Sequence, residues 1–214
     1  MIISFSGIDS AGKTTQVELL MKYFEEQGIG AKKVWSKARA TPGVVALKQL
    51  LRRDKGLDDA QKAEYRKEVF RNPKKEKLLY IASMLDLCWY WGIYYRVLKL
   101  FYKYIVCDRY LWDTYVEINS DFAGIDIDRS LLWKMVRLVS PKPKVSFVFI
   151  VPPEVSLKRD HDKNAAGIET IVIKKHKIDL YMKCIDAKCW TNVMNGMNSI
   201  EELQQQVLNV LELN

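Results

Sequence analysis

The chain has 214 residues, 49% of them hydrophobic, which is enough for one domain (1–214) with a sizeable core. Lys and Arg total 34 against 26 Asp and Glu, so the net charge of +8 favours anionic partners. The basic residues are spread along the chain, which favours phosphorylated small molecules over nucleic acid, and no charged leader with a cleavage site precedes the first apolar run.

The first predicted elements are an apolar strand at 2–6 and an amphipathic helix at 14–26, joined by a loop of the pattern G-x-x-x-x-G-K-T. Glycines let such a loop curl so that its N–H groups face phosphate oxygens, and the helix start adds a positive dipole end. The pattern arises by chance in a chain of this length about once in a hundred cases, and the strand–loop–helix context makes chance less frequent still. Lys13 is expected to reach the β- and γ-phosphates, and Thr14 to hold Mg²⁺. The residues expected to bind ATP are Gly7, Ser10, Ala11, Gly12, Lys13, Thr14 and Thr15.

A second strand is predicted at 31–36, and a helical pattern follows Pro42. Asn72-Pro73 then interrupts the chain before a strongly apolar stretch at 78–95. This stretch approaches membrane-spanning length, but Asp86 lies in its middle. A buried helix, or a helix whose aromatic face around Trp89, Trp91 and Tyr95 meets another subunit, is therefore the better interpretation, and we expect no membrane partner.

The second half of the chain continues the alternation of strands and helices. Strands are predicted at 104–107, 145–151 and 190–194, and helices begin near Pro153 and at the capping box Ser199-Ile200-Glu201-Glu202. The pattern predicts an α/β fold of the P-loop NTPase type, with a parallel sheet covered by helices on both faces.

Polar residues follow several predicted strands, and parallel sheets bind ligands beyond their carboxyl ends. Arg39, Asp108, Arg109 and Arg159 occupy such positions. A single arginine there is more commonly a solvated surface charge. Together with the phosphate loop, however, this set suits phosphoryl transfer, in which arginines and Mg²⁺ neutralise the transferring group.

The cysteines and histidines indicate neither disulfides nor a zinc site. The four cysteines form no C-x-x-C pair, and two isolated histidines do not complete a ligand set of recognised spacing. Free thiols in a reducing cytoplasm are the simplest interpretation.

Five segments together resemble the thymidylate kinase family, over nearly the whole chain. They are F-S-G-I-D-S-A-G-K-T-T-Q at 5–16, C-D-R-Y at 107–110, P-K-P at 141–143, P-E-V-S-L-K-R at 153–159 and S-I-E-E at 199–202. The resemblance implies a nucleoside monophosphate kinase that transfers the γ-phosphate of ATP, with Mg²⁺, to an acceptor such as dTMP. It also implies a homodimer that pairs through helices.

The resemblance also implies individual roles. Arg39 and Arg109 would hold the acceptor phosphate, Asp9 would face the acceptor sugar, and Asp108 would lie near Mg²⁺. Tyr80 would stack on the base, although a core position on a helix is an equally good interpretation. The residues expected to act in catalysis are Lys13, Arg109 and Arg159.

The chain departs from the family pattern at three places. Ser10 stands where some members carry an arginine, and the basic side chains of residues 160–175, His161 apart, are the lysines Lys163, Lys174 and Lys175. Met84 aligns with an arginine that contacts the base. The polar segment at about 159–169 is expected to form a mobile lid, and the loss of a directional donor at position 84 predicts a relaxed or shifted base preference.

Other functions are compatible with the phosphate loop alone. A GTPase switch would need an [NT]-K-x-D motif, which the sequence does not contain. A non-catalytic nucleotide-binding relative that acts as a regulatory or interaction module stays open, as does a kinase for another nucleotide or nucleoside.

Overall fold

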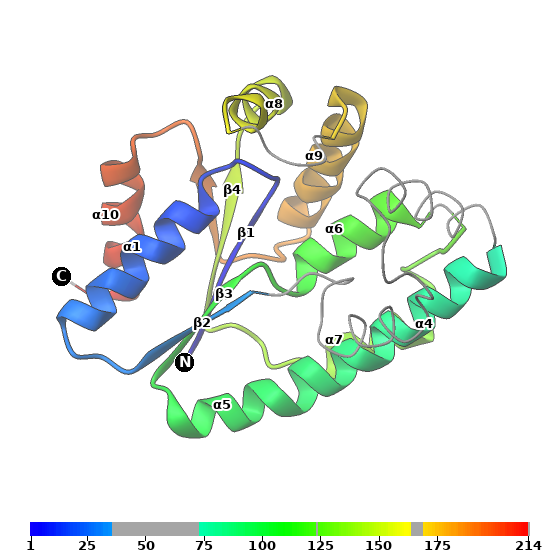
Figure 1. Cartoon of the computed structure of the whole chain (residues 1–214), viewed down its shortest axis with the longest axis horizontal. Helices are drawn as coiled ribbons and strands as arrows, with labels where there is room; N and C mark the ends of the chain where they lie inside the picture. Colours follow the sequence, from blue (N-terminus) through cyan, green and yellow to red (C-terminus); the bar gives the residue numbers. More distant parts are fainter. Residues whose placement is uncertain (36–72, 123, 164–168, 214) are drawn as a thin grey trace, which may run out of the picture.

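The computed structural model describes residues 1–35, 73–122, 124–163 and 169–213, and these form one parallel sheet covered by helices (Figure 1). The sheet has the strand order β2-β3-β1-β4-β5, and every pairing in it is parallel. The strands are β1 (Ile2–Gly7), β2 (Ala31–Trp35), β3 (Tyr104–Asp108), β4 (Val145–Ile150) and β5 (Asn192–Asn195).

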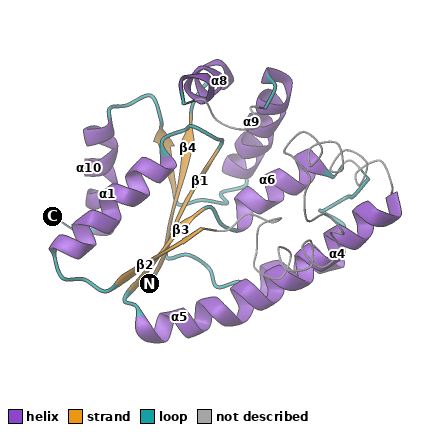
Figure 2. Ribbon diagram, in the orientation of Figure 1, coloured by secondary structure: helices purple, strands orange, loops and turns teal. Residues whose placement is uncertain are grey.

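Helices cover both faces of the sheet, as the sequence predicts. Figures 1 and 2 show α1 and α10 on one face, and α4, α5, α6 and α9 on the other together with α7, which is labelled in Figure 1, while α8 lies beyond the carboxyl ends of the strands. The helices are α1 (Lys13–Glu26), α4 (Pro73–Trp89), the π-helical turn η1 (Tyr90–Tyr94), α5 (Tyr95–Phe101), α6 (Leu111–Asp121), α7 (Leu131–Val139), α8 (Pro153–Asp162), α9 (Ile171–Asp186) and α10 (Ile200–Leu211).

The central strand β1 is buried along its whole length, because helices lie on both sides of it. Successive side chains alternate between the faces, so Ile3 and Phe5 belong to the core under α1 while Ile2 belongs to the core under α4. The register pairs Phe5 with Asp108 and Gly7 with Phe149. The phosphate loop and the residues after β3 and β4 therefore meet at one edge of the sheet.

The long aromatic helix begins earlier and ends later than the predicted stretch at 78–95. The helices α4, η1 and α5 form one continuous element from residue 73 to residue 101, with the π-helical turn in its second half. The aromatic subunit face expected around Trp89, Trp91 and Tyr95 is wrong for two of its members, since Trp91 and Tyr95 are fully buried and only Trp89 is exposed. Among the described residues, no helix has the length and apolar character needed to cross a membrane.

The other predicted elements have mixed outcomes. All five predicted strands are present, and the capping box is confirmed, because Ser199 and Glu202 exchange backbone-to-side-chain hydrogen bonds of 3.1 Å. The helices α6, α7 and α9 were not predicted. The helix expected after Pro42 lies outside the described residues, as do residues 164–168 of the predicted lid.

Candidate active site

The phosphate loop adopts the unusual backbone conformations that its sequence requires. Gly7 has a φ of +134°, and a Cβ there would lie 2.3 Å from the carbonyl oxygen of Phe149. Gly12 has a φ of +96° at the start of α1, and Ser10 has a φ of +56°. Such conformations favour glycine and turn successive amides toward one side, which is what binding of a phosphate chain needs.

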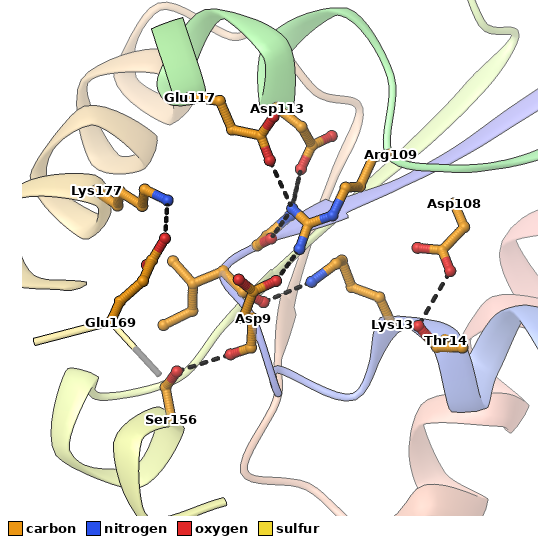
Figure 3. Close-up of polar contacts among 12 residues, drawn as sticks. Asp9, Lys13, Thr14, Asp108, Arg109, Asp113, Glu117, Ser156, Glu169 and Lys177 are labelled. Carbon is orange, nitrogen blue, oxygen red and sulfur yellow. Dashed lines mark hydrogen bonds and ion pairs between the residues drawn. The ribbon is translucent and has the colours of Figure 1, made fainter. Parts of the chain in front are cut away.

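Lys13 is the first residue of α1, and its buried side chain reaches back to the loop, where Nζ donates a hydrogen bond to the carbonyl of Ile8 (Figure 3). Burial lowers the pKa of Lys13 to about 7, with a further contribution from Arg109, against the opposing effect of neighbouring carboxylates. The side chain is thus held in a position where added negative charge, such as a phosphate, would strongly favour its charged form.

Thr14 and Asp108 join the loop to the end of β3. Thr14 Oγ1 donates to Asp108 Oδ2 at 3.0 Å (Figure 3). A hydroxyl and a carboxylate beside a phosphate loop are hard oxygen donors that suit Mg²⁺. Proteins usually bind this ion through one or two side chains, and water molecules and substrate phosphates supply its other ligands. Among the described residues there is no cluster of three or more acidic, histidine or cysteine side chains of metal-binding geometry.

Arg109 follows β3 directly and carries the site's second buried cation. Its φ of +75° is uncommon for a residue with a side chain, and such strain is found mainly at functional sites. The guanidinium pairs with Asp9 and lies 3.7 Å from Asp113 Oδ1 and 3.9 Å from Glu117 Oε1 (Figure 3). Although burial opposes the charge, these three carboxylates raise the pKa of Arg109 above its usual value, so the side chain stays charged.

Asp113 is a central residue of the site that sequence reasoning missed. This buried carboxylate accepts hydrogen bonds from Ser6 Oγ at 2.6 Å, the Gly7 amide at 3.0 Å, the Tyr110 amide at 3.1 Å and Tyr181 Oη at 2.7 Å. It therefore joins β1, the start of α6 and α9. Its partners on β1 lie up to 107 residues away in the sequence, so no local pattern pointed to it.

Arg159 lies on α8 and contacts the loop from outside. Its Nη1 lies 3.3 Å from the Ser10 carbonyl and 3.2 Å from the Gly196 carbonyl, to which it donates hydrogen bonds. The first residues of the predicted lid, Arg159–Asp162, are thus helical and attached to the loop. Movement of the remaining segment stays a prediction.

The residues expected to bind the acceptor base lie on α4. Tyr80 and Met84 are buried, with exposed fractions of 4% and 0%. The Tyr80 hydroxyl donates to Ser130 Oγ at 2.6 Å, and its ring meets Phe122 edge-on. These are contacts of a core residue, so a stacking role for Tyr80 stays a prediction, while Arg39 lies outside the described residues.

Comparisons with known proteins agree on one family. The family model described as thymidylate kinase matches residues 5–207. The thymidylate kinase of Wolbachia pipientis subsp. Culex pipiens is 31% identical over 174 residues, which cover 77% of this chain and 71% of that protein. A probable thymidylate kinase of Pyrococcus abyssi is 24% identical over 216 residues, covering 96% of this chain and 93% of that protein.

Among solved structures, the crystal structure of thymidylate kinase from Ehrlichia chaffeensis is similar in fold, with a TM-score of 0.58 and 22% identity over 99% of this chain and 98% of that one. The fold, the phosphate loop and the family match point the same way. The chain belongs to the thymidylate kinase family of nucleoside monophosphate kinases.

Proposed function

We propose that the protein transfers the γ-phosphate of ATP to dTMP and produces dTDP. The observation that carries the proposal is the juxtaposition of two buried cations, Lys13 of the phosphate loop and Arg109 after β3, in a chain of the thymidylate kinase family. One cation belongs to the donor side of such a site and the other to the acceptor side. A phosphoryl group passing between two phosphates needs positive charge on both sides.

In this proposal the loop and the start of α1 bind ATP. The first N–H groups of α1 have no intrahelical acceptor and lie at the positive end of the helix dipole. Lys13 exchanges its hydrogen bond with the Ile8 carbonyl for phosphate oxygens. Thr14 and Asp108 would hold Mg²⁺, which would neutralise the phosphates as a Lewis acid.

On the acceptor side, Arg109 binds the phosphate of the nucleotide and Asp9 fixes the guanidinium. An arginine presents a planar pair of donors, which matches two phosphate oxygens at once. Glu117 and Asp113 lie within 4 Å of the same guanidinium, so they orient it and prevent it from turning into solvent. Arg39 would add a second cation to the acceptor phosphate.

We expect the site to select the acceptor base less strictly than it selects for the acceptor phosphate. With Met84 in place of an arginine, the acceptor pocket lacks a directional donor to the base, and a site without such a hydrogen bond discriminates weakly between bases of similar shape. We therefore expect dTMP to be accepted together with other pyrimidine monophosphates, dUMP first among them.

We further propose that the protein acts as a cytoplasmic homodimer. Its four cysteines are free thiols, which suits a reducing compartment. Four apolar side chains of the long helix, at regular four-residue spacing, are each at least 44% exposed. Together they form an exposed apolar surface, here called the seam, against which a second copy of the chain can pack. They are Leu85, Trp89, Ile93 and Val97.

A coupled assay of ADP formation tests the function, with MgATP as donor and a panel of nucleoside monophosphates and nucleosides as acceptors. We expect ADP formation that depends on dTMP, lower activity with dUMP and none with thymidine. Lys13→Ala is expected to fold normally and to lose at least about a hundredfold in turnover, the usual loss for a donor that stabilises transition-state charge.

Each part of the proposal has a result that would contradict it. ADP formation that no acceptor stimulates would exclude the kinase activity, and normal turnover by correctly folded Lys13→Ala would exclude Lys13 from the ATP site. A preference for dTMP over dUMP above about a thousandfold, equivalent to roughly 4 kcal/mol, would show that residues other than the one at position 84 read the base.

A further inference from the structure

The outer side of the phosphate loop rests against α8, and two side chains of this helix contact consecutive carbonyls of the loop. Ser156 Oγ donates to the Asp9 carbonyl at 2.7 Å (Figure 3). Arg159 Nη1 donates to the Ser10 carbonyl at 3.3 Å. Ser156 and Arg159 are three residues apart, so they lie on the same face of the helix.

Holding a carbonyl also orients the amide next to it. In a planar trans peptide, the C=O of one residue and the N–H of the next point in opposite directions. With the Asp9 carbonyl directed toward α8, the Ser10 amide is directed away from α8, toward the inner side of the loop. The hydrogen bond from Ser156 therefore fixes the direction of one phosphate-facing donor.

A buried ion pair determines how Ser156 uses its hydroxyl. Lys174 Nζ, on α9, donates to Ser156 Oγ at 2.8 Å and lies 2.6 Å from Asp160 Oδ2. Ser156, Lys174 and Asp160 are all buried, with exposed fractions of 0%, 1% and 5%. An ammonium has hydrogens to donate and no lone pair, so the Ser156 oxygen accepts from Lys174 and its own hydrogen remains for the Asp9 carbonyl.

We propose that Ser156 and Lys174 are positioning residues of the ATP site. Asp160 balances the charge of Lys174, Lys174 orients the Ser156 hydroxyl, and Ser156 holds the peptide between Asp9 and Ser10 in its phosphate-binding orientation. The inference rests on the proposed function only in taking ATP as the ligand of the loop. It also gives Lys174, one of the lysines near the predicted lid, a role through the loop instead of direct contact with the transferring phosphate.

Ser156→Ala is the first test, because it removes only the hydroxyl. We expect the dissociation constant of MgATP, measured by calorimetry, to rise about fivefold, the effect of one neutral hydrogen bond. In the steady state, the KM for ATP should rise by the same factor while kcat at saturating ATP stays within about twofold. The double variant Glu154→Gln/Lys175→Gln is the matched control, since this exposed pair at 3.4 Å joins the same two helices away from the loop.

The ion pair is tested by replacing both partners, because removal of one would leave a buried charge unpaired. A buried pair replaced by apolar side chains commonly retains stability, so Lys174→Met/Asp160→Leu should fold. Without the ammonium the Ser156 hydroxyl can rotate, and serines in helices often turn to a backbone carbonyl one turn earlier. MgATP binding should weaken about two- to fivefold, and adding Ser156→Ala should weaken it no further than Ser156→Ala alone.

Unchanged MgATP binding by folded Ser156→Ala overturns the inference, and so does a loss of equal size in the control variant. Additive losses in the triple variant overturn the part assigned to Lys174. The binding measurement needs no acceptor. A protein that binds MgATP but does not phosphorylate dTMP would therefore contradict the proposed function and leave this inference intact.

Discussion

Lys13 and Arg109 are both buried cations of the active site, yet their surroundings affect them in opposite ways. Burial lowers the pKa of Lys13 to about 7, whereas the carboxylates of Asp9 and Glu117 raise the pKa of Arg109. A lysine can lose its proton when desolvated, but arginine stays charged in proteins. The free enzyme thus has one permanent cation for the acceptor and one cation that a ligand can restore.

Binding of MgATP should therefore take up a proton at Lys13. At pH 8.5 the side chain is mostly neutral in the free protein, and the phosphates stabilise its charged form, so we expect uptake of about one proton per ATP bound. Calorimetry in buffers of different ionisation enthalpy measures this number. MgATP affinity should also fall as the pH rises from about 7, since protonation then costs more.

The lowered pKa of Lys13 also makes the stability of the fold depend on pH in a defined direction. Because its pKa is lower in the folded than in the unfolded chain, the unfolded chain binds more protons between about pH 7 and 10.5, and stability from this group rises with pH across that window. Lys13→Met should show neither this rise nor proton uptake. Equal uptake by the wild type and Lys13→Met would assign the proton to another group.

Spacing in the sequence identifies some site residues and leaves others hidden. Lys13 and Thr14 belong to a pattern of contiguous residues, and Arg109 follows a recognisable strand, so local sequence is sufficient to find them. Ser156 and Asp113 meet the loop only through packing of α8 and α6 against it, across sequence separations of 147 and 106 residues. No local pattern encodes such a contact.

At the scale of elements, hydrophobic periodicity found the strands but missed α6, α7 and α9. The reasons are clearest for α6 and α7. Three polar side chains of α6, Asp113, Thr114 and Glu117, are buried, so its core-facing side does not look apolar. In α7, which has only nine residues, Leu131 and Leu138 are exposed although Val136 is buried, so its apolar residues do not mark the buried face alone. A helix is predicted from hydrophobic periodicity when its apolar residues form one stripe that faces the core, and neither α6 nor α7 shows this pattern clearly.

Asp113 joins three of these elements, and its loss should be severe. Asp113→Ala leaves the Gly7 amide and the Tyr181 hydroxyl without their buried acceptor and removes a carboxylate near Arg109. We expect the free energy of unfolding to fall by about 3–5 kcal/mol, measured by urea denaturation. Asp186→Ala, at an exposed position on α9, should change it by less than about 0.5 kcal/mol, and equal effects of the two changes would contradict this role.

At the scale of the whole molecule, the long helix presents different faces to the core and to solvent. Trp91 is buried and packs against Tyr110 with ring centroids 4.8 Å apart, while Trp89 is 54% exposed. Two positions apart along a helix, these side chains lie on nearly opposite sides of its axis, so one aromatic surface cannot contain both. The exposed seam consists of the four apolar residues named above as the dimer contact.

Charges introduced on this seam should separate the proposed dimer. Trp89→Lys/Ile93→Lys places two ammonium groups in the contact, so sedimentation velocity should show a dimeric wild type and a monomeric, folded variant. Val210→Lys is the control, because Val210 is 39% exposed on α10 across the sheet (Figure 1). A monomeric wild type, or a variant that stays dimeric, would contradict the assignment.

The position of β1 in the middle of the sheet has a consequence for synthesis of the chain. Ile2 pairs with Ile105, and Gly7 pairs with Phe149, so β1 must wait for both of its neighbours, which are made later, to leave the ribosome. At about 5–20 residues per second, translation of the intervening hundred residues takes roughly 5–20 s. During that interval an apolar strand with two unpaired edges is available to nascent-chain chaperones, and slower translation would prolong its exposure.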